Sequence, residues 1–374
     1  MKVSLLSGAY KNAGDFLIVQ RCKELLKYLY DDIEIKEYKR DKKLDENIHE
    51  INKSDVLIIA GGPAYVKNLY PNKIPLVDDL DSIKIPIFAM AMGWKGKNDN
   101  QKTVYSYSFD ELTIKLLKRI EHDGFSLGCR DIYTQRVLNN AGIKNTIMTG
   151  CAAWYDIKNI NNLSLNDNNI SKICISDPAD PKYYNQFLDV IKFMKKRYSN
   201  ANIRVIFHRG ITSDNFTSKK DEKKIQYICS EINKMGIKYL DIAYDYKGMS
   251  IYDTCDLHIG YRVHAHIYNL SKRNKTILIE EDGRGAGVNH SLGLLGIKAY
   301  ALKFNNDSFF YKISNKFFLE HNVSKYVVPE INDYINELEN NNFKQLEWAF
   351  ERMNYYFDNM LKHLKQLNKL QKNK

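Results

Sequence analysis

The sequence predicts an α/β protein with two Rossmann-like domains that face a cleft and are closed by C-terminal helices. Short runs of β-branched and apolar residues alternate with longer amphipathic stretches, which is typical of parallel strands joined by helices. This alternation occurs twice, and an asparagine-rich stretch at residues 156–171 separates the two series as a linker. The chain has 374 residues, enough for two domains that each bury a hydrophobic core.

The first series occupies residues 1–155 and forms the expected N-terminal domain. Its buried strands are expected at residues 2–6, 33–38, 55–60, 86–92 and 125–129. Helices are expected at residues 15–30, at 110–121 and directly after Arg130. The strands are short and largely apolar, as strands covered by helices on both faces are.

The second series forms the expected C-terminal domain, residues 172–328. Its strands are expected at residues 172–176, 203–208, 257–260 and 276–280, with helices at 182–198, at 217–236 and from about 263. Residues 329–374 are expected to form C-terminal helices that end in a basic tail. One face of the last helix is apolar and carries Met353, Phe357, Met360, Leu364 and Leu367.

The composition indicates a cytoplasmic protein. The net charge of +11 suits a nucleic acid, an anionic membrane surface or an anionic substrate. Nucleic acid ranks last, because the basic residues are dispersed and do not alternate with aromatic residues in a stripe. The six cysteines are scattered without a CxxC pair, which favours neither disulfides nor a zinc site. No segment is apolar for long enough to cross a membrane.

Polar residues that follow the expected strands are the candidate site, because ligands of open α/β sheets bind beyond the carboxyl ends of the strands. After the first strand, Asn12 and Asp15 stand where a helix begins. Asp15 either caps that helix or faces the cleft as a ligand or base. After residues 55–60, Gly61 and Gly62 offer backbone amides that could cradle an anion, although Gly-Gly-Pro is also an ordinary turn.

Two further strand ends carry cations. Arg130 follows residues 125–129 at the start of a helix, a position that suits a phosphate or carboxylate clamp or else a surface ion pair. His208 ends the strand at 203–208 and lies either in the cleft or on the surface.

The segment GYRVHAH at residues 260–266 concentrates cationic residues directly after a strand. Arg262 and His264 are the main candidates for contact with an anion, since His264 falls in the first helical turn beside free backbone amides. His266 lies one turn into the helix and is expected to support them. Acidic partners at ligand spacing are missing, so a metal site is not expected.

Together these motifs resemble the polysaccharide pyruvyltransferase family. The resemblance spans roughly residues 1–300 and rests on N-x-GD at 12–15, GG at 61–62, RD at 130–131, TGC at 149–151 and RVHA at 262–265. Members of the family are similar in fold to two-domain glycosyltransferases of the GT-B type. They transfer a pyruvyl group from phosphoenolpyruvate to a sugar and form a cyclic ketal or a related product.

The resemblance implies roles for individual residues. The N-terminal domain would carry the acceptor and the C-terminal domain the donor, with Arg130, Arg262 and His264 at the donor. Arg284 stands where the family usually has a lysine, eight residues before Leu292. It either holds the donor or forms a surface pair with Glu281 or Asp282.

The expected chemistry needs no metal and no cofactor. Arginines suit the carboxylate and phosphate of phosphoenolpyruvate, the donor substrate. His264, with a reference pKa of about 6.5, would act as general acid or stabilise the departing phosphate, and Asp15 would receive the hydroxyl proton. The acceptor is expected to be a sugar of a lipid-linked surface glycan, with the basic tail touching anionic lipid at the inner face of the membrane.

Two other functions stay open. A GT-B glycosyltransferase that uses a nucleotide sugar would place an acidic residue such as Glu280 or Glu281 on the ribose. A glycan-binding relative without activity would be expected to lose the cations of the cleft, which this chain keeps.

Overall fold

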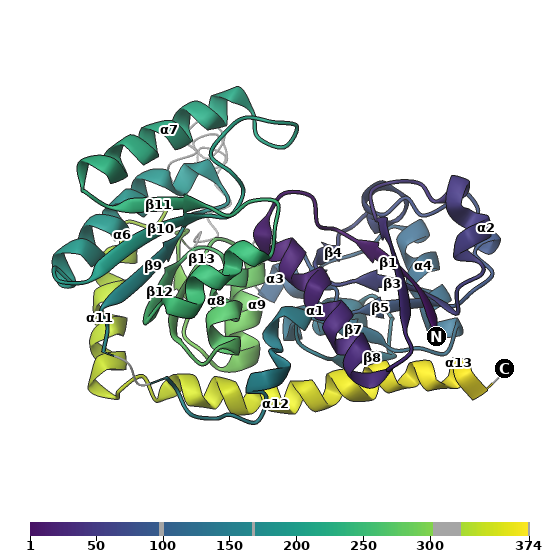
Figure 1. Ribbon diagram of the computed structural model, residues 1–374. Helices are drawn as coiled ribbons and strands as arrows, with labels where there is room; N and C mark the ends of the chain where they lie inside the picture. The colour runs from purple at the N-terminus through teal and green to yellow at the C-terminus, as the bar shows by residue number, and fades with distance from the viewer. Residues whose placement is uncertain (97–100, 167–168, 302–322, 373–374) are drawn as a thin grey trace.

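The computed structural model describes residues 1–96, 101–166, 169–301 and 323–372. Figure 1 shows two α/β halves side by side, with a long helix running beneath both. The N-terminal half is built on a four-stranded parallel sheet in the order β2-β1-β3-β5, formed by β1 (Lys2–Ser7), β2 (Glu34–Lys39), β3 (Val56–Ala60) and β5 (Ile87–Met90). The fold class expected from the sequence is confirmed.

Short parallel pairs extend the N-terminal half. One pair joins β4 (Pro63–Tyr65) to β6 (Gly93–Trp94), and the other joins β7 (Leu127–Cys129) to β8 (Thr146–Met148). A parallel bridge between Met92 and Cys129 links the region after β5 to β7. The helices of this half are α1 (Ala13–Leu29), α2 (Ile48–Ile51), α3 (Gln101–Tyr105), α4 (Glu111–His122) and α5 (Ile132–Asn140).

The C-terminal half has a six-stranded parallel sheet in the order β11-β10-β9-β12-β13-β14. Its strands are β9 (Lys172–Ser176), β10 (Asn202–Phe207), β11 (Lys238–Asp241), β12 (Leu257–Gly260), β13 (Lys275–Glu280) and β14 (Ile297–Lys298). Every residue of β12 and β13 is buried, including the polar residues His258 and Thr276, because both strands lie inside a sheet that is covered on both faces. The helices are α6 (Tyr184–Arg197), α7 (Lys219–Lys234), α8 (Val263–Ser271) and α9 (Gly283–Leu292).

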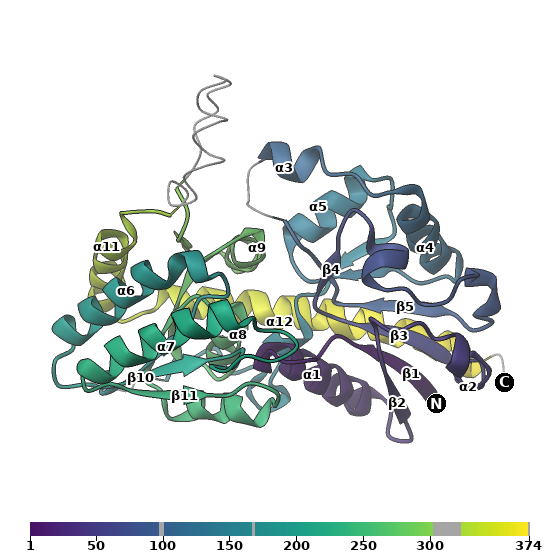
Figure 2. The same cartoon turned by 90° about the horizontal axis from the view of Figure 1, so that it is seen from above.

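The C-terminal helices tie the two halves together. They are α11 (Val327–Asn340), α12 (Gln345–Leu364) and α13 (Lys369–Lys372), and Figure 2 shows α12 crossing from the C-terminal to the N-terminal half. In the N-terminal half of α12, Arg352 donates to the carbonyl oxygen of Ser291 at 3.4 Å. Near the C-terminal end of α12, His363 is buried, contacts the carbonyl oxygen of Ala89 at 3.1 Å and stacks on Phe88.

Loops from the two halves also meet directly. The backbone N–H of Ala13, at the start of α1, donates to the carbonyl oxygen of His208, which follows β10, at 3.1 Å. One residue before the cap of α1, the buried Lys11 forms an ion pair with Asp214 at 2.6 Å. These contacts place the ends of β1 and β10 next to each other. Within the described ranges, no helix has the length and apolar character needed to span a membrane.

Candidate active site

A cavity lies where the two halves meet, and we call it the junction cavity. It contains about 430 Å³ of space, part of it open to solvent. Its lining comes from strand ends of both halves and consists of Asn12, Arg130, Ala179, His208, Tyr261, Arg262, Val263, His264, Glu281 and Arg284. Ligands of open α/β sheets bind beyond the carboxyl ends of the strands, and the junction cavity lies at these ends.

Arg262 is fixed by Asp177, which follows β9. The guanidinium donates from Nε to Oδ1 at 2.7 Å and from Nη2 to Oδ2 at 2.5 Å, and both side chains are buried. Burial lowers the pKa of Arg262, but Asp177 outweighs it and the net shift is upward. Its Nη1 group makes no hydrogen bond to the described residues, so that edge remains for a ligand in the cavity.

His264 occupies the first turn of α8, and neither of its ring nitrogens has a hydrogen-bond partner among the described residues. Burial lowers its pKa to about 4; nearby arginines push in the same direction, and Asp15 opposes them. Burial therefore favours the neutral form of the ring near pH 7. This corrects the expectation of an ordinary histidine pKa, and an anion bound beside the ring would shift the pKa back upward.

Arg130 is buried, which rules out a surface ion pair. Its Nε donates to Asp131 at 3.2 Å and its Nη2 to the carbonyl oxygen of Trp94 at 3.3 Å. Asp131 is the N-cap of α5 and accepts from the backbone of Thr134 at 2.8 Å. Gly93 makes room for the guanidinium, because a Cβ there would lie 2.5 Å from Nη2 of Arg130.

Arg284 lines the junction cavity and also forms an ion pair. It stands in the first turn of α9, whose N-cap Asp282 accepts from Nε at 2.9 Å and from Nη2 at 2.7 Å. Its side chain is 26% exposed. The segment GRGAG is therefore the start of a helix and not a flexible turn, and the ion pair aims the arginine into the cavity.

Other predicted site residues have different environments. Asn12, and not Asp15, is the N-cap of α1, and its side chain accepts from the backbone of Gly14 at 3.4 Å. His208 lines the cavity, and its Nε2 lies 2.7 Å from the hydroxyl of Tyr252. His266 is not among the lining residues; its Nδ1 lies 2.9 Å from the hydroxyl of Thr276 in β13, so it fastens α8 to the sheet.

The two glycines after β3, which were expected to offer backbone amides to an anion, do not line the junction cavity. The N–H of Gly61 donates to the carbonyl oxygen of Met90 at 2.7 Å and is therefore occupied. Gly62 lines a second, smaller and more open pocket, together with Asp15 and Arg40; its space of about 170 Å³ includes open solvent. Asp15 belongs to the wall of this second pocket, although its charge acts on His264 in the first.

Three residues in or beside these pockets were not assigned to the donor or acceptor site from the sequence. Asp177 follows β9 directly, and its position at a strand end could have identified it. Glu281 lines the junction cavity, accepts from the N–H groups of Ala179 and Asp180 at 2.9 and 3.0 Å, and has a pKa that burial raises to about 7. Arg40 follows β2, an edge strand with a polar sequence, and carried no signal.

Comparison with known proteins identifies a family. A sequence model of the family described as polysaccharide pyruvyl transferase matches residues 12–282, more than half of the 374 residues. The resemblance seen in the motifs is thereby confirmed. Compared with curated protein sequences, the chain has no significant match.

Comparison with solved structures concerns the fold. A protein from Listeria monocytogenes, assigned as a UDP-N-acetylglucosamine 2-epimerase, is similar with a TM-score of 0.50 and 10% identity over 93% of this chain and 90% of that chain. The UDP complex of MnaA from S. aureus gives a TM-score of 0.46 and 10% identity, covering 91% of this chain and 97% of that chain. The wall teichoic acid polymerase TagF gives 0.46 and 10% identity, covering 100% and 90%. The arrangement is GT-B-like.

Proposed function

This chain belongs to the polysaccharide pyruvyl transferase family, and we propose that it moves a pyruvyl group from phosphoenolpyruvate onto a sugar to form a pyruvate ketal. The observation that supports the donor is the convergence of three arginines and one histidine on the junction cavity. Arg130 comes from the N-terminal half, and Arg262, His264 and Arg284 come from the C-terminal half.

Each of the three arginines is oriented by one aspartate. The pairs are Arg130 with Asp131, Arg262 with Asp177, and Arg284 with Asp282. The aspartates cancel part of the positive charge, but they hold each guanidinium in one direction before a ligand arrives. Phosphoenolpyruvate carries a carboxylate and a phosphate on a small frame, and planar guanidinium groups recognise both. Oriented donors that need no rearrangement favour binding and transition-state stabilisation.

The proposed reaction transfers protons from the acceptor to the donor. A proton adds to the methylene carbon of phosphoenolpyruvate and creates an oxocarbenium-like centre. One sugar hydroxyl forms a bond to that carbon, the C–O bond to phosphate breaks, and a second hydroxyl closes the ketal. The two hydroxyl protons end on the new methyl group and on the released phosphate, so the reaction balances without an oxidant or reductant.

His264 and Asp15 are the residues we assign to proton movement. Burial lowers the pKa of His264 to about 4, and the negative charge of the donor would favour protonation of the ring. It would then stabilise the departing phosphate or supply the proton. Asp15 lines the second pocket, its charge acts on His264 in the first, and we assign it as the acceptor for the hydroxyl proton.

The glycosyltransferase alternative lacks a free carboxylate for a ribose at the expected positions. An oxygen of Glu280 accepts from the side chain of Asn289 at 2.8 Å. The carboxylate of Glu281 accepts from the backbone N–H groups after β9. Both carboxylates already accept hydrogen bonds from the protein. Neither therefore supports binding of a nucleotide sugar in place of phosphoenolpyruvate.

We further propose a lipid-linked acceptor at the inner face of the membrane. The exposed side of the last helices carries Lys362, Lys365 and Lys369 together with Trp348 and Tyr355, which are 63% and 64% exposed. Lysines attract anionic headgroups, and tryptophan and tyrosine favour the interface between lipid and water.

A thermal-shift and turnover experiment tests the donor. Phosphoenolpyruvate at one hundred times its dissociation constant should stabilise the fold by about 2.7 kcal/mol, and UDP-, GDP- and CMP-sugars should not. Release of phosphate from phosphoenolpyruvate should depend on an added glycoside. His264→Ala should abolish turnover, whereas Arg130→Ala should chiefly weaken donor binding. Stabilisation by a nucleotide sugar without any by phosphoenolpyruvate would overturn the proposal in favour of a glycosyltransferase.

A further inference from the structure

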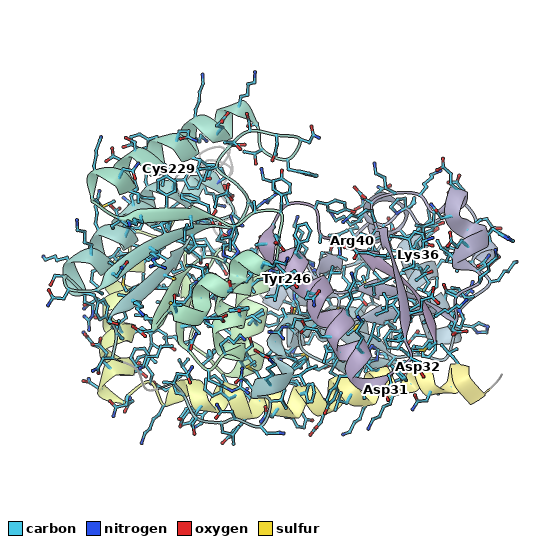
Figure 3. All side chains as sticks on the ribbon, in the orientation of Figure 1. Asp31, Asp32, Lys36, Arg40, Cys229 and Tyr246 are labelled. Atoms are coloured by element: carbon cyan, nitrogen blue, oxygen red, sulfur yellow. The ribbon has the colours of Figure 1, made fainter. Side chains whose placement is uncertain are left out.

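The second pocket, which we call the Arg40 pocket, lies in the N-terminal half beside the junction cavity. Its walls come from the ends of β1, β2 and β3 and from the first turns of α1, and consist of Gly8, Asp15, Ile18, Val19, Arg40, Ala60 and Gly62. It thus combines one guanidinium, one carboxylate and three aliphatic side chains. Figure 3 labels Arg40.

Arg40 makes one hydrogen bond and no ion pair to the described residues, whereas Arg21, which is also buried, pairs with both Glu24 and Asp156. Arg40 is 7% exposed, and its one hydrogen bond runs from Nη1 to the carbonyl oxygen of Gly61 at 3.1 Å. Arg130 and Arg262 each pair with an aspartate, and Arg273 donates to several backbone carbonyls. Four of the five guanidinium N–H groups of Arg40 therefore have no partner within the ranges that the structure describes.

The backbone around Arg40 is bare of side chains on two sides. A Cβ on Gly8 would lie 2.5 Å from Nη2 of Arg40, and one on Gly62 would lie 3.0 Å from Nη1. Alanine at Gly8 would therefore displace the guanidinium, and Gly62 also has a positive φ of 77°. These two glycines allow the arginine to lie flat against the ends of β1 and β3.

Asp15 connects the Arg40 pocket to the junction cavity. Its carboxylate acts electrostatically on Arg40 in one pocket and on His264 and Arg284 in the other. It forms no ion pair with Arg40 within the described residues, so the two charges face the same space without closing it. A group placed between them would need both to accept a hydrogen bond from Arg40 and to donate one to Asp15.

We propose that the Arg40 pocket binds the acceptor sugar through two neighbouring hydroxyl groups, one accepting from Arg40 and the other donating to Asp15. This inference rests on the proposed function. A neutral polyol fits the pocket better than an anion, because Asp15 offsets the charge of Arg40 and would repel a second carboxylate. Ile18, Val19 and Ala60 provide an apolar wall for the C–H face of a sugar ring. The hydroxyl at Asp15 is then the one that attacks the donor in the adjoining cavity.

The test separates binding of acceptor from binding of donor. We would measure donor affinity by calorimetry, and acceptor Michaelis constants by phosphate release with a panel of methyl glycosides that carry vicinal or 1,3-diols. Arg40→Gln should raise the glycoside Michaelis constant roughly ten- to hundredfold, the effect of losing a hydrogen bond to a charged group. Affinity for phosphoenolpyruvate should stay within about twofold. Gly8→Ala should give the same pattern, because it displaces the guanidinium.

Lys36→Gln is the matched control, since Lys36 is an exposed cation on β2 that pairs with Glu50 at the surface. It should change neither constant. An unchanged glycoside Michaelis constant in Arg40→Gln, or an equal loss for donor and glycoside, would overturn the inference and leave the donor proposal intact. So would a wild-type protein that binds phosphoenolpyruvate but accepts no glycoside of the panel. Absence of phosphoenolpyruvate binding in the wild type would instead remove the proposed function itself.

Discussion

The imidazole of His264 packs against the backbone of Gly14, so closely that a Cβ on Gly14 would lie 2.6 Å from Cγ of the ring. Gly14 belongs to the first turn of α1 in the N-terminal half, and His264 to the first turn of α8 in the C-terminal half. Gly14 therefore fixes the position of the ring from the other half of the molecule. It can do so because it has no side chain that would occupy the same space.

Gly14→Ala should therefore push His264 away from its place in the junction cavity. We expect a stability loss of about 1–3 kcal/mol from overpacking, and a fall in kcat/KM of up to about a hundredfold from misplacement of the ring. Chemical denaturation and phosphate release measure the two effects.

A double-variant cycle identifies the cause. In a His264→Ala background the clash is absent, so adding Gly14→Ala should cost little further stability. If Gly14→Ala costs the same with and without His264, the contact between the two residues does not explain the loss.

Arg284→Ala should weaken the binding of phosphoenolpyruvate roughly ten- to hundredfold, because a charge-assisted contact contributes about 1.5–3 kcal/mol. Arg284→Lys should recover much of this, since lysine is the residue usual in the family. If Arg284 only pairs with Asp282, its loss should lower the free energy of unfolding by about 1 kcal/mol and leave the affinity for phosphoenolpyruvate unchanged.

Arg119→Ala is a matched control for Arg284→Ala. Arg119 is 22% exposed and pairs with Asp123 at 2.8 Å on α4, outside the junction cavity. Calorimetry should show wild-type donor affinity in this variant. Equal affinities for wild type, Arg284→Ala and Arg284→Lys would remove Arg284 from the donor site.

The strand-end rule predicted the junction cavity well from the sequence. Arg130 lies far along the chain from Arg262 and Arg284, yet each of the three follows a strand whose carboxyl end points to the same junction. Parallel sheets place such ends along one edge, so the order of strands and helices was enough to bring the residues together. The roles of these residues remain predictions.

Other features depend on tertiary neighbours that the sequence does not show. His266 has the same local surroundings in the sequence as His264, but it faces Thr276 of the sheet and not the cavity. Arg40 follows the polar edge strand EIKEYK, and its pocket exists only because Gly8 and Gly62 come from two other strand ends. The pKa of His264 departs from its reference value for the same reason, since burial by both halves causes it.

Short strands were also missed. β4, β6, β8, β11 and β14 are two to four residues long, too short for a period-two pattern to stand out. The start of α9 contains three glycines in GRGAG, a composition that favours a turn, and the helix forms because Asp282 caps it and its glycines pack closely against Asp131 and Glu280.

Binding of phosphoenolpyruvate should be coupled to proton uptake by His264. Burial lowers the pKa of the ring to about 4, and a bound anion would raise it. If the pKa of His264 is higher in the complex than in the free protein, the affinity for phosphoenolpyruvate increases as the pH falls. The increase begins near the pKa of the complex and ends near the pKa of the free protein, about 4. Calorimetry in buffers of different ionisation enthalpy between about pH 6 and pH 7 would measure the protons taken up.

His264→Gln corrects this measurement for the donor itself, since the phosphate also titrates near a pKa of about 6. The variant should show only the proton exchange of the phosphate, which is a release, because the arginines favour the phosphate dianion. Equal proton exchange by wild type and His264→Gln would show that the ring does not change protonation when the donor binds.

Replacing Lys362, Lys365 and Lys369 together by glutamine should weaken binding to anionic vesicles. Each lysine near such a surface contributes about 1 kcal/mol, so the triple variant should bind roughly a hundredfold more weakly, and the difference should shrink at high salt. Co-sedimentation with phosphatidylcholine vesicles, with and without phosphatidylglycerol, measures this.

The matched control replaces Lys220, Lys223 and Lys224 of α7, which are exposed and lie at the opposite side of the molecule from α12 in Figure 1. Both variants lose three positive charges, so only a defined membrane face makes them differ. If the two lose vesicle binding equally, net charge and not the C-terminal helix attracts the protein to lipid.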